Sequence, residues 1–438
     1  ITNSEVSREC GAESCVDSTI TDYMYYEKVL QAKEITHFLN ITGLFGIYHD
    51  LHLKLELPVV LQRTNKLSVH EDIDEATAKE LLKDPDGNPM FNIPFTSADR
   101  SGIDYFVTGL EWGIMNQSRN ESHPDWNIYI EGLWGVGAIM KPAGSTDIDG
   151  DLGYGDPGIS RGNLSLRGGT RMSKRFKYIN PYFGFEFLFE FPQREAPYPY
   201  NNATVYDGQV NVMPPMRGYI HFGMEVIPWE KPARQQKLFF DLMFIGGYVS
   251  EGRDFSVLSD ALGTSNNPYL NYYKGSPDWW ENKVGTEHFI DTWNQNYGPG
   301  DQLCWNDVTG YYEECGRGGE EYDWYGKEHW TGLTDQENYG TFGGRFTIGF
   351  ITSKWFKIMA GVQVRYNQPH FITFADQCNS GSYEEYADGS SNCVIGGHSS
   401  GVSSYNPDYR AILDEMGNRF KISSTIMVNV FVNAVAMF

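Results

Sequence analysis

Apolar and polar residues alternate over long stretches of this chain, most clearly in its last nineteen residues, FKISSTIMVNVFVNAVAMF (420–438). The even positions from Phe420 to Phe438 are apolar except for Ser424, and the odd positions include Lys421 and Asn429. A period of two puts successive side chains on opposite faces of a β-strand. The segment is also longer than the usual strand of a globular protein. The pattern therefore predicts a long strand with different surroundings on its two faces.

Ten further segments show the same alternation, with Phe and Leu prominent on one face and charges on the other. They are 35–46, 51–62, 104–114, 126–138, 163–174, 181–191, 217–227, 237–248, 341–351 and 355–367. A soluble sandwich or propeller also contains alternating strands. A transmembrane barrel explains the strand length, the apolar faces and the mid-strand charges together, because lipid lies outside and a polar lumen inside.

The connections between these strands alternate in length. Short turns follow the strands that end near residues 45, 114, 174, 227 and 351, whereas the long connections are 63–102, 139–162, 192–216, 249–340 and 368–418. Short turns on one side and long loops on the other are typical of bacterial outer-membrane barrels. The expected fold is all-β: one antiparallel transmembrane barrel that occupies 1–438 as a single domain.

Eleven strands can be read from the pattern, whereas single-chain bacterial barrels have an even number. We therefore expect about twelve strands. The twelfth could come from Thr19–Leu30, from residues before Ile1 or from another chain, and "ITNSEVSREC" (1–10) looks a poor candidate. No signal peptide is present at Ile1, which indicates a processed product or a truncated sequence. No apolar run is long enough for a membrane-spanning helix.

The apolar alternation that ends on Phe438 resembles the last strand of Gram-negative, porin-like outer-membrane β-barrel proteins. The resemblance implies an integral outer-membrane location, contact with membrane lipid and lipopolysaccharide, and recognition of Phe438 by the barrel-assembly machinery. The run "GLFGIYHDLHLKLELPVVLQ" (43–62) is similar to a hairpin of unassigned barrels from myxobacteria-like organisms.

Charged residues occupy the face that would line the lumen. They could form a pore in which opposed charges select small polar solutes. Alternatively, they could pair structurally, Glu131 with Arg167 or Arg171 and Asp241 with Arg345, and close a narrow barrel. The predicted lumen-lining residues are Lys54, Glu56, Glu111, Glu131, Arg167, Arg171, Glu186, Glu190, Arg217, His221, Glu225, Asp241, Arg345, Lys357, Arg365, Arg419 and Lys421.

Loop 249–340 concentrates the chain's acidity. It holds seventeen acids and five bases, which give −12 of the total net charge of −23, and six Trp residues. Because long structureless loops are uncommon, we expect it to fold as an extracellular cap. The cap could bind a ligand or partner through its aromatic residues, or it could be a lid that packs on itself. The acidic balance argues against nucleic acid as a partner.

The six cysteines form three close pairs in polar sequence, Cys10/Cys15, Cys304/Cys315 and Cys378/Cys393. Three disulfides in an oxidising compartment are expected, because no pair has the spacing of a metal site. In "DIDGDLGYGD", Asp147, Asp149 and Asp151 have the spacing of a calcium loop but lack its Gly and its last Glu, so solvated turn acids are favoured over bound Ca²⁺. The segment 74–84 predicts a short helix.

Neither His221 with Glu225 nor His288 with Asp291 accompanies a recognisable nucleophile, so we expect no enzyme and no cofactor. Two functions remain open. The first is a narrow passive channel for small polar solutes. The second is a non-conducting surface barrel whose loops contact a partner protein, a glycan or a neighbouring subunit, with a homo-oligomer as one form.

Overall fold

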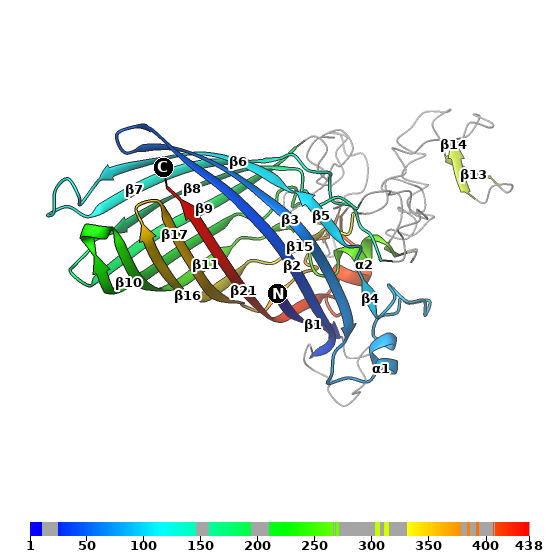
Figure 1. Ribbon diagram of the computed structural model, residues 1–438. Helices are drawn as coiled ribbons and strands as arrows, with labels where there is room; N and C mark the ends of the chain where they lie inside the picture. Colours follow the sequence, from blue (N-terminus) through cyan, green and yellow to red (C-terminus); the bar gives the residue numbers. More distant parts are fainter. Residues whose placement is uncertain are drawn as a thin grey trace.

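The chain folds into one closed barrel of twelve long antiparallel strands in the computed structural model (Figure 1). The structure describes residues 1–10, 25–145, 157–193, 210–265, 267, 269–270, 303–306, 311–314, 331–377, 383–385, 391–393, 406 and 408–437. The barrel strands are β1 (Thr2–Cys10), β2 (Tyr25–Tyr48), β3 (Leu51–Val69), β6 (Tyr105–Met115), β7 (Asp125–Gly135), β8 (Asn163–Ser173), β9 (Ile179–Pro192), β10 (Arg217–Lys231), β11 (Gln236–Val249), β16 (Tyr339–Ser353), β17 (Phe356–Asn367) and β21 (Phe420–Ala436). The predicted fold class is confirmed.

Each barrel strand pairs with the next one along the chain, and β1 returns to β21 to close the ring. Short strands add to its rim: β4 (Phe95–Thr96) and β5 (Arg100–Ile103) pair with β3, and β18 (His370–Phe371) pairs with β21. All eleven strands predicted from the alternation are present. Since every ladder is antiparallel between sequence neighbours, each strand needs only a turn or a loop to reach its partner.

The twelfth strand is the segment that looked a poor candidate. Residues Thr2–Cys10 form β1, so that expectation was wrong, and Tyr25–Leu30 begin β2. The alternation fails in β1 because its polar side chains find polar partners across the ladder. Ser4 Oγ bonds Thr425 Oγ1 at 2.8 Å, and Glu5 pairs with Lys28 at 3.0 Å. Cross-strand polar pairs stabilise a sheet without an apolar face.

β1 covers only part of the edges that flank it. Its ladder reaches Glu34 on β2 and Met427 on β21, and the Ile1 carbonyl accepts from the Val428 N–H at 2.8 Å. Beyond that point, within the described residues, the remainder of β2 is paired only with β3 and the remainder of β21 only with β17.

The two ends of the barrel differ as the sequence predicted. At the turn end, β2 and β3 are joined by a two-residue turn at His49 and Asp50, and β16 and β17 by a turn at Lys354 and Trp355. His49 has a φ of 41°, the left-handed backbone that such tight hairpins require. The described parts of the long connections lie at the opposite, loop end (Figure 1).

The loop end carries short helices and small two-stranded sheets. Its helices are α1 (Glu75–Glu80), α2 (Ser259–Gly263) and α5 (Ala411–Asp414), and its sheets pair β12 (Gly252–Asp254) with β15 (Thr334–Gln336), β13 (Leu303–Asn306) with β14 (Tyr311–Glu314), and β19 (Tyr383–Glu385) with β20 (Ser391–Cys393). The helix predicted in 74–84 is α1. It starts where Asp74 accepts from the Thr77 N–H at 3.0 Å.

A hydrophobic core fills part of the loop end. Leu258 and Leu262 from α2 and its approach, Leu413 from α5, and Phe420 at the start of β21 are all fully buried there. The same core takes apolar side chains from β1, β2, β3 and the α1 segment. The loop end is therefore packed like the interior of a globular domain.

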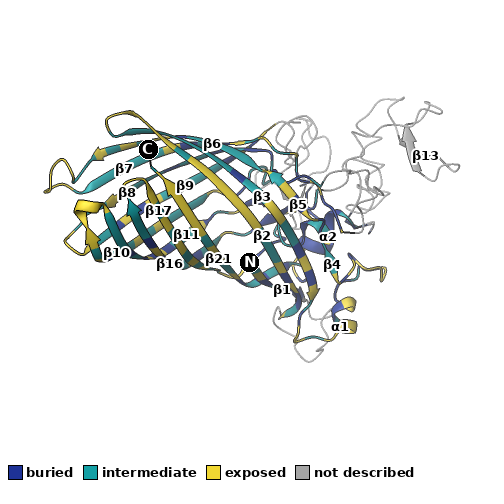
Figure 2. Cartoon of the chain, in the orientation of Figure 1, coloured by how far each residue is buried: buried dark blue, intermediate teal, exposed yellow. Residues whose placement is uncertain are grey.

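The outward face of the strands is apolar and exposed instead (Figure 2). Ile130 is 53% exposed, Phe222 56% and Phe244 49%. Comparable side chains project from most of the other barrel strands, so they form a continuous apolar surface much larger than a soluble monomer usually shows. In the part of the chain that is described, no helix is long and apolar enough to span a membrane.

The three expected disulfides fall outside what the structure describes. Cys15, Cys315 and Cys378 are not among the described residues. Their expected partners lie in or at the end of described strands, Cys10 in β1, Cys304 in β13 and Cys393 in β20, but the side chains of these three are not described. The structure therefore does not show the pairs Cys10/Cys15, Cys304/Cys315 and Cys378/Cys393, and all three disulfides stay predictions.

Other predictions also concern atoms outside the described part of the chain. They are the acids Asp147, Asp149 and Asp151, the terminal Phe438 and most of the expected cap in 249–340. The calcium loop, the assembly signal and the cap as a whole likewise stay predictions.

Candidate functional site: the polar lumen wall

The inward faces of the strands carry most of the charges that the sequence assigned to the lumen. Along β17 exposure alternates residue by residue, so that Lys357, Gln363 and Arg365 lie on the less exposed face, opposite Ile358 and Val362. A cavity of about 410 Å³ opens at the turn end. Its lining is Asp50, His52, Glu111, Gly113, Met115, Asn116, Asp125, Asn127, Arg171 and Ser173.

One ion-pair network joins three strands near the middle of the wall. Lys54 of β3 lies 2.8 Å from Glu56 and 3.0 Å from Glu131 of β7, and Arg167 of β8 donates from Nε to Glu131 at 2.6 Å. Lys54 reaches past β6 because Gly109 stands there. A Cβ on Gly109 would come within 2.6 Å of the Glu131 side chain. The expected pairing of Glu131 with Arg167 or Arg171 is met by Arg167.

The same construction recurs on the neighbouring strands. Tyr129 of β7 passes over Gly169 of β8, whose Cβ would lie 2.6 Å from the Tyr129 hydroxyl, and donates to Glu186 of β9 at 2.8 Å. Glu111 of β6 accepts from the Asn127 amide at 3.0 Å. Glu186 and Glu111 therefore have neutral donors as partners.

A third crossing links β9 to β16. Tyr182 of β9 passes over Gly223 of β10 and donates to Asp241 of β11 at 2.7 Å, while Arg345 of β16 bonds the other oxygen of Asp241 at 3.0 Å. The expected Asp241–Arg345 pair is present. Next to it, Lys237 pairs with Glu225 across the β10–β11 ladder.

These contacts run along the wall and not through the lumen. Among the described residues, each ion pair between two barrel strands joins either adjacent strands or, for Lys54 and Glu131, strands with one other between them. An inward glycine at the crossed position lets a long side chain lie flat. The pairing that the sequence suggested could close the barrel thus leaves the lumen axis uncrossed.

Towards the loop end the wall meets a second network. Arg161 lies 3.2 Å from Glu190 and 2.6 Å from Asp254, and Arg217 lies 3.2 Å and 2.9 Å from the same two acids. Asp254 belongs to β12. The four residues therefore attach the segment Gly252–Gly263, which we name the mouth segment, to the ends of β9 and β10.

The mouth segment is bonded to several other parts of the rim. Arg253 is 1% exposed and lies 3.0 Å from both Asp335 of β15 and Asp408, which precedes β21. On another side, the Val257 carbonyl accepts from Asn65 of β3 at 2.7 Å, and Arg100 of β5 pairs with α2 through Asp260. Because β3, β10 and the approach to β21 lie at well-separated positions of the ring, the mouth segment crosses the loop end.

Burial sets the acid–base behaviour of this segment. Desolvation raises the pKa of Asp335 to about 7, although the Arg253 guanidinium beside it acts in the opposite direction. Burial likewise raises the pKa of Asp260, against the attraction of Arg100. In the described ranges, no group of three or more His, Cys, Asp or Glu side chains could hold a metal ion.

Four of the basic residues predicted to line the lumen have no carboxylate partner among the described residues of the wall. Two other basic residues lie away from the middle of the wall. Arg171, Lys357 and Arg365 face aromatic rings, as described below, and His221 lies over Gly184. Arg419 and Lys421 are at the loop end, beyond a shift in the β1–β21 register. There Arg419 donates to Glu9 at 2.7 Å, and the Lys421 ammonium group makes cation–π contacts with the Tyr26 and Phe371 rings.

Sequence reasoning missed the tyrosines and glycines of the wall, and the mouth segment. Tyr129, Tyr182 and the inward glycines carry no charge, so a search for charged positions passes over them. Their signal was Gly at inward positions, where the alternation otherwise places large polar residues.

Comparison with known proteins does not assign this chain to a family. No known protein-family profile matches the chain, and no curated protein matches it. Among solved structures, the COG4313 outer membrane channel from Pseudomonas putida F1 aligns with 98% of this chain and 92% of its own, at 7% identity and a TM-score of 0.32. A TM-score this low supports no inference about the present chain. The comparisons also offer no support for the likeness of 43–62 to barrels of myxobacteria-like organisms.

Proposed function

We propose that the protein is an integral outer-membrane channel, narrow and passive, for small polar solutes. The carrying observation is the arrangement of the wall, in which charged side chains pair along the strands over inward glycines and leave the axis uncrossed. The exposed apolar outward face fits a lipid environment, where a barrel satisfies its backbone groups between strands. With the short turns placed on the periplasmic side, as in bacterial outer-membrane barrels, the turn end is periplasmic and the loop end is extracellular.

Barrel size is compatible with this function. Eight strands give an interior filled by side chains and sixteen give an aqueous channel, so twelve strands lie between the two and strand number alone is consistent with a narrow passage. The cavity of about 410 Å³ at the turn end is one open part of it. At the other end, the mouth segment restricts access to the lumen.

The mouth segment also favours a second candidate function, a non-conducting barrel whose extracellular loops bind a partner protein, a glycan or another subunit. A packed core and several buried ion pairs at the loop end would suit such a surface. Under this alternative the mouth segment would close the lumen permanently.

Single-channel recording in planar bilayers distinguishes the two functions. The purified, folded protein is expected to give small, discrete conductance steps, and reductant is expected to change them if disulfides restrain the loops. A variant that lacks 252–263 would serve as the open-mouth control. Silence of both proteins in the folded state contradicts the channel, whereas silence of the intact protein alone supports the closed surface barrel.

A further inference from the structure

The charges of the lumen wall are separated between opposite sides of the barrel. Strands β16, β17 and β21 contain no Asp or Glu, and β16 and β17 contribute Arg345, Lys357 and Arg365. Strands β6 and β7 contain no Lys or Arg, and their acids include Glu111 and Glu131. In the ring order, β6 lies opposite β16 and β7 lies opposite β17. The lumen therefore has an acidic side and a basic side.

The acids on the acidic side are already bonded. Glu131 has two cationic partners, Lys54 and Arg167, and Glu111 accepts from Asn127. The opposite charges of Lys54 and Arg167 cancel most of the field of Glu131 at a distance. Glu111 keeps its charge, because its partner Asn127 is neutral, so Glu131 is the neutralised acid of this side.

The cations on the basic side are not bonded in this way. Neither Lys357 nor Arg365 lies within ion-pair distance of a carboxylate of the described chain. Lys357 faces the Phe239 ring at 5.1 Å and Arg365 the Tyr219 ring at 5.2 Å. A ring stabilises a cation by only about 0.5–1 kcal/mol at an accessible site and does not neutralise its charge.

Two guanidinium groups on this side also keep a donor unused. The Nε atoms of Arg345 and Arg365, on adjacent strands, are buried and have no hydrogen-bond partner. A buried N–H without an acceptor is costly.

A further cation faces the basic side from across the lumen. Arg171 of β8 lies over the Tyr182 ring at 4.6 Å and also has no carboxylate partner in the described chain. Five steps of the ring order separate β8 from β17, yet Arg171 is an electrostatic neighbour of Lys357, as is Lys237. The acids that act electrostatically on Lys357 include Glu225 and Asp241, and both are bonded to other cations.

We propose that Arg171, Lys357 and Arg365 form an anion-binding constriction, and that the channel passes small anions such as chloride, phosphate and short carboxylates in preference to cations. This inference rests on the proposed channel function and adds the class of solute. The aromatic rings hold the cations against the wall, and none of the three cations forms an ion pair with a carboxylate of the described chain.

The test is the reversal potential of the current under a gradient of KCl across a planar bilayer. For the intact protein we expect a shift towards the chloride equilibrium potential. In the double variant K357Q/R365Q we expect the chloride-to-potassium permeability ratio to fall about fivefold, since two unpaired charges leave the wall. R365K, which keeps the charge, should retain most of the selectivity.

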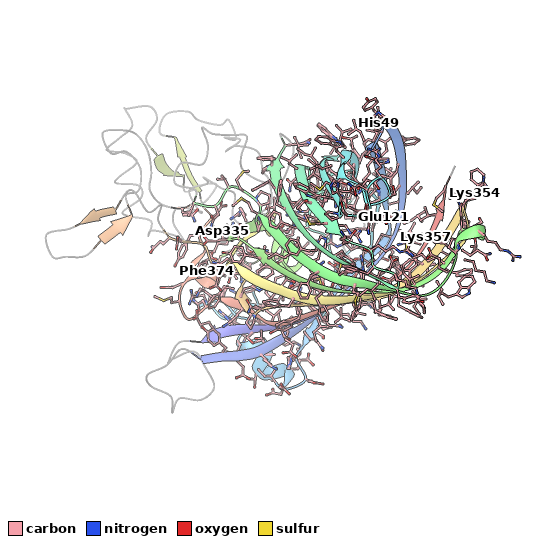
Figure 3. All side chains as sticks on the ribbon, turned by 90° about the vertical axis from the view of Figure 1, so that its left-hand side faces the viewer. His49, Glu121, Asp335, Lys354, Lys357 and Phe374 are labelled. Carbon is pink, nitrogen blue, oxygen red and sulfur yellow. The ribbon has the colours of Figure 1, made fainter. Side chains whose placement is uncertain are left out.

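The matched control is Lys354→Gln, which removes an exposed cation three residues before Lys357, at the rim of the turn end (Figure 3). It should leave the ratio unchanged. Each variant is first shown to be folded by the heat-dependent shift of its mobility in electrophoresis. If a variant does not fold, inorganic phosphate is added to the intact protein, where saturable reduction of the chloride current is expected.

The outcomes test the channel function and the anion constriction separately. No current from the folded protein overturns the channel function itself. A current that prefers potassium overturns only the anion constriction. Anion preference that survives in K357Q/R365Q, or a chloride current that phosphate does not reduce, shows that these residues are not the site.

Discussion

Replacement of Arg253 by Ala is expected to loosen the mouth segment without unfolding the barrel. The Arg253 side chain is almost fully buried and lies 3.0 Å from one oxygen of Asp335 and 3.0 Å from one of Asp408. It also donates to the Leu333 carbonyl at 3.1 Å. The substitution leaves two buried acids without this partner. Removal of one member of a buried ion pair typically costs about 3–5 kcal/mol.

That cost should appear as local opening, because β12 and β15 form a separate two-stranded sheet. A loss of about 3 kcal/mol corresponds to a factor of more than about 100 in the opening equilibrium. Hydrogen–deuterium exchange of peptides covering β12 and β15 should therefore accelerate by about two orders of magnitude at pH 8, whereas peptides from β10 keep their protection. The single-channel conductance should rise in parallel.

The control is Lys79→Ala, which removes an exposed pair with Glu75 on α1 and should change exchange little. Exchange of β12 and β15 that stays within about threefold of the intact protein in R253A would refute the reasoning, since about threefold is under 1 kcal/mol. It would mean that the β12–β15 sheet is held by contacts other than this ion-pair cluster.

Three further outcomes follow from burial, glycine packing and the apolar surface. The pKa of Asp335 is raised to about 7 from an unfolded value near 4, so the folded segment holds a proton between these limits and gains stability as pH falls; the protection factor of β15, which compares its exchange rate with the intrinsic rate at each pH, should rise from pH 8 to pH 5, and Asp335→Asn should abolish that dependence. Gly223→Ala should destabilise the barrel by about 1–3 kcal/mol in urea unfolding, because its Cβ would meet a tyrosine hydroxyl and a carbonyl at 2.5 Å; Gly246→Ala, where nothing lies within 4 Å, is the matched control, and equal losses in the two variants would contradict the packing argument. Phe222→Arg on the outward face should lower folding stability in lipid vesicles by about 2–4 kcal/mol if the band lies at the bilayer midplane, and an unchanged stability would place that surface in water.

Much of the barrel was predictable from the sequence because the strands obey a local rule. In lipid, a barrel strand needs an apolar face, so Ile358, Val362 and Val364 alternate with polar residues on β17 and identify it without reference to any other strand. β1 could not be found in this way. Its serines and acids are accommodated by particular partners on β2 and β21, such as Thr425, which lies more than 400 residues away.

The candidate site was predictable only in part. Alternation assigned the charged side chains to one face, and charge complementarity suggested Asp241 with Arg345. It did not show that Tyr182 would cross Gly223 to reach the same carboxylate, because that contact depends on the register of three strands at once. Nor could it show which cations would stay unpaired, since Arg171 and Arg167 look alike in sequence.

The sequence by itself determined eleven of the twelve barrel strands, the two unlike faces of the wall and the division into short turns and long loops. These features repeat every two residues or lie within one connection, so local chemistry is sufficient to define them. The tertiary structure alone decided that β1 closes the ring, that the mouth segment crosses the loop end, and that the acidic and basic sides of the lumen face each other. Each of these depends on ring order and register, which bring together residues far apart in the chain and which no local pattern encodes.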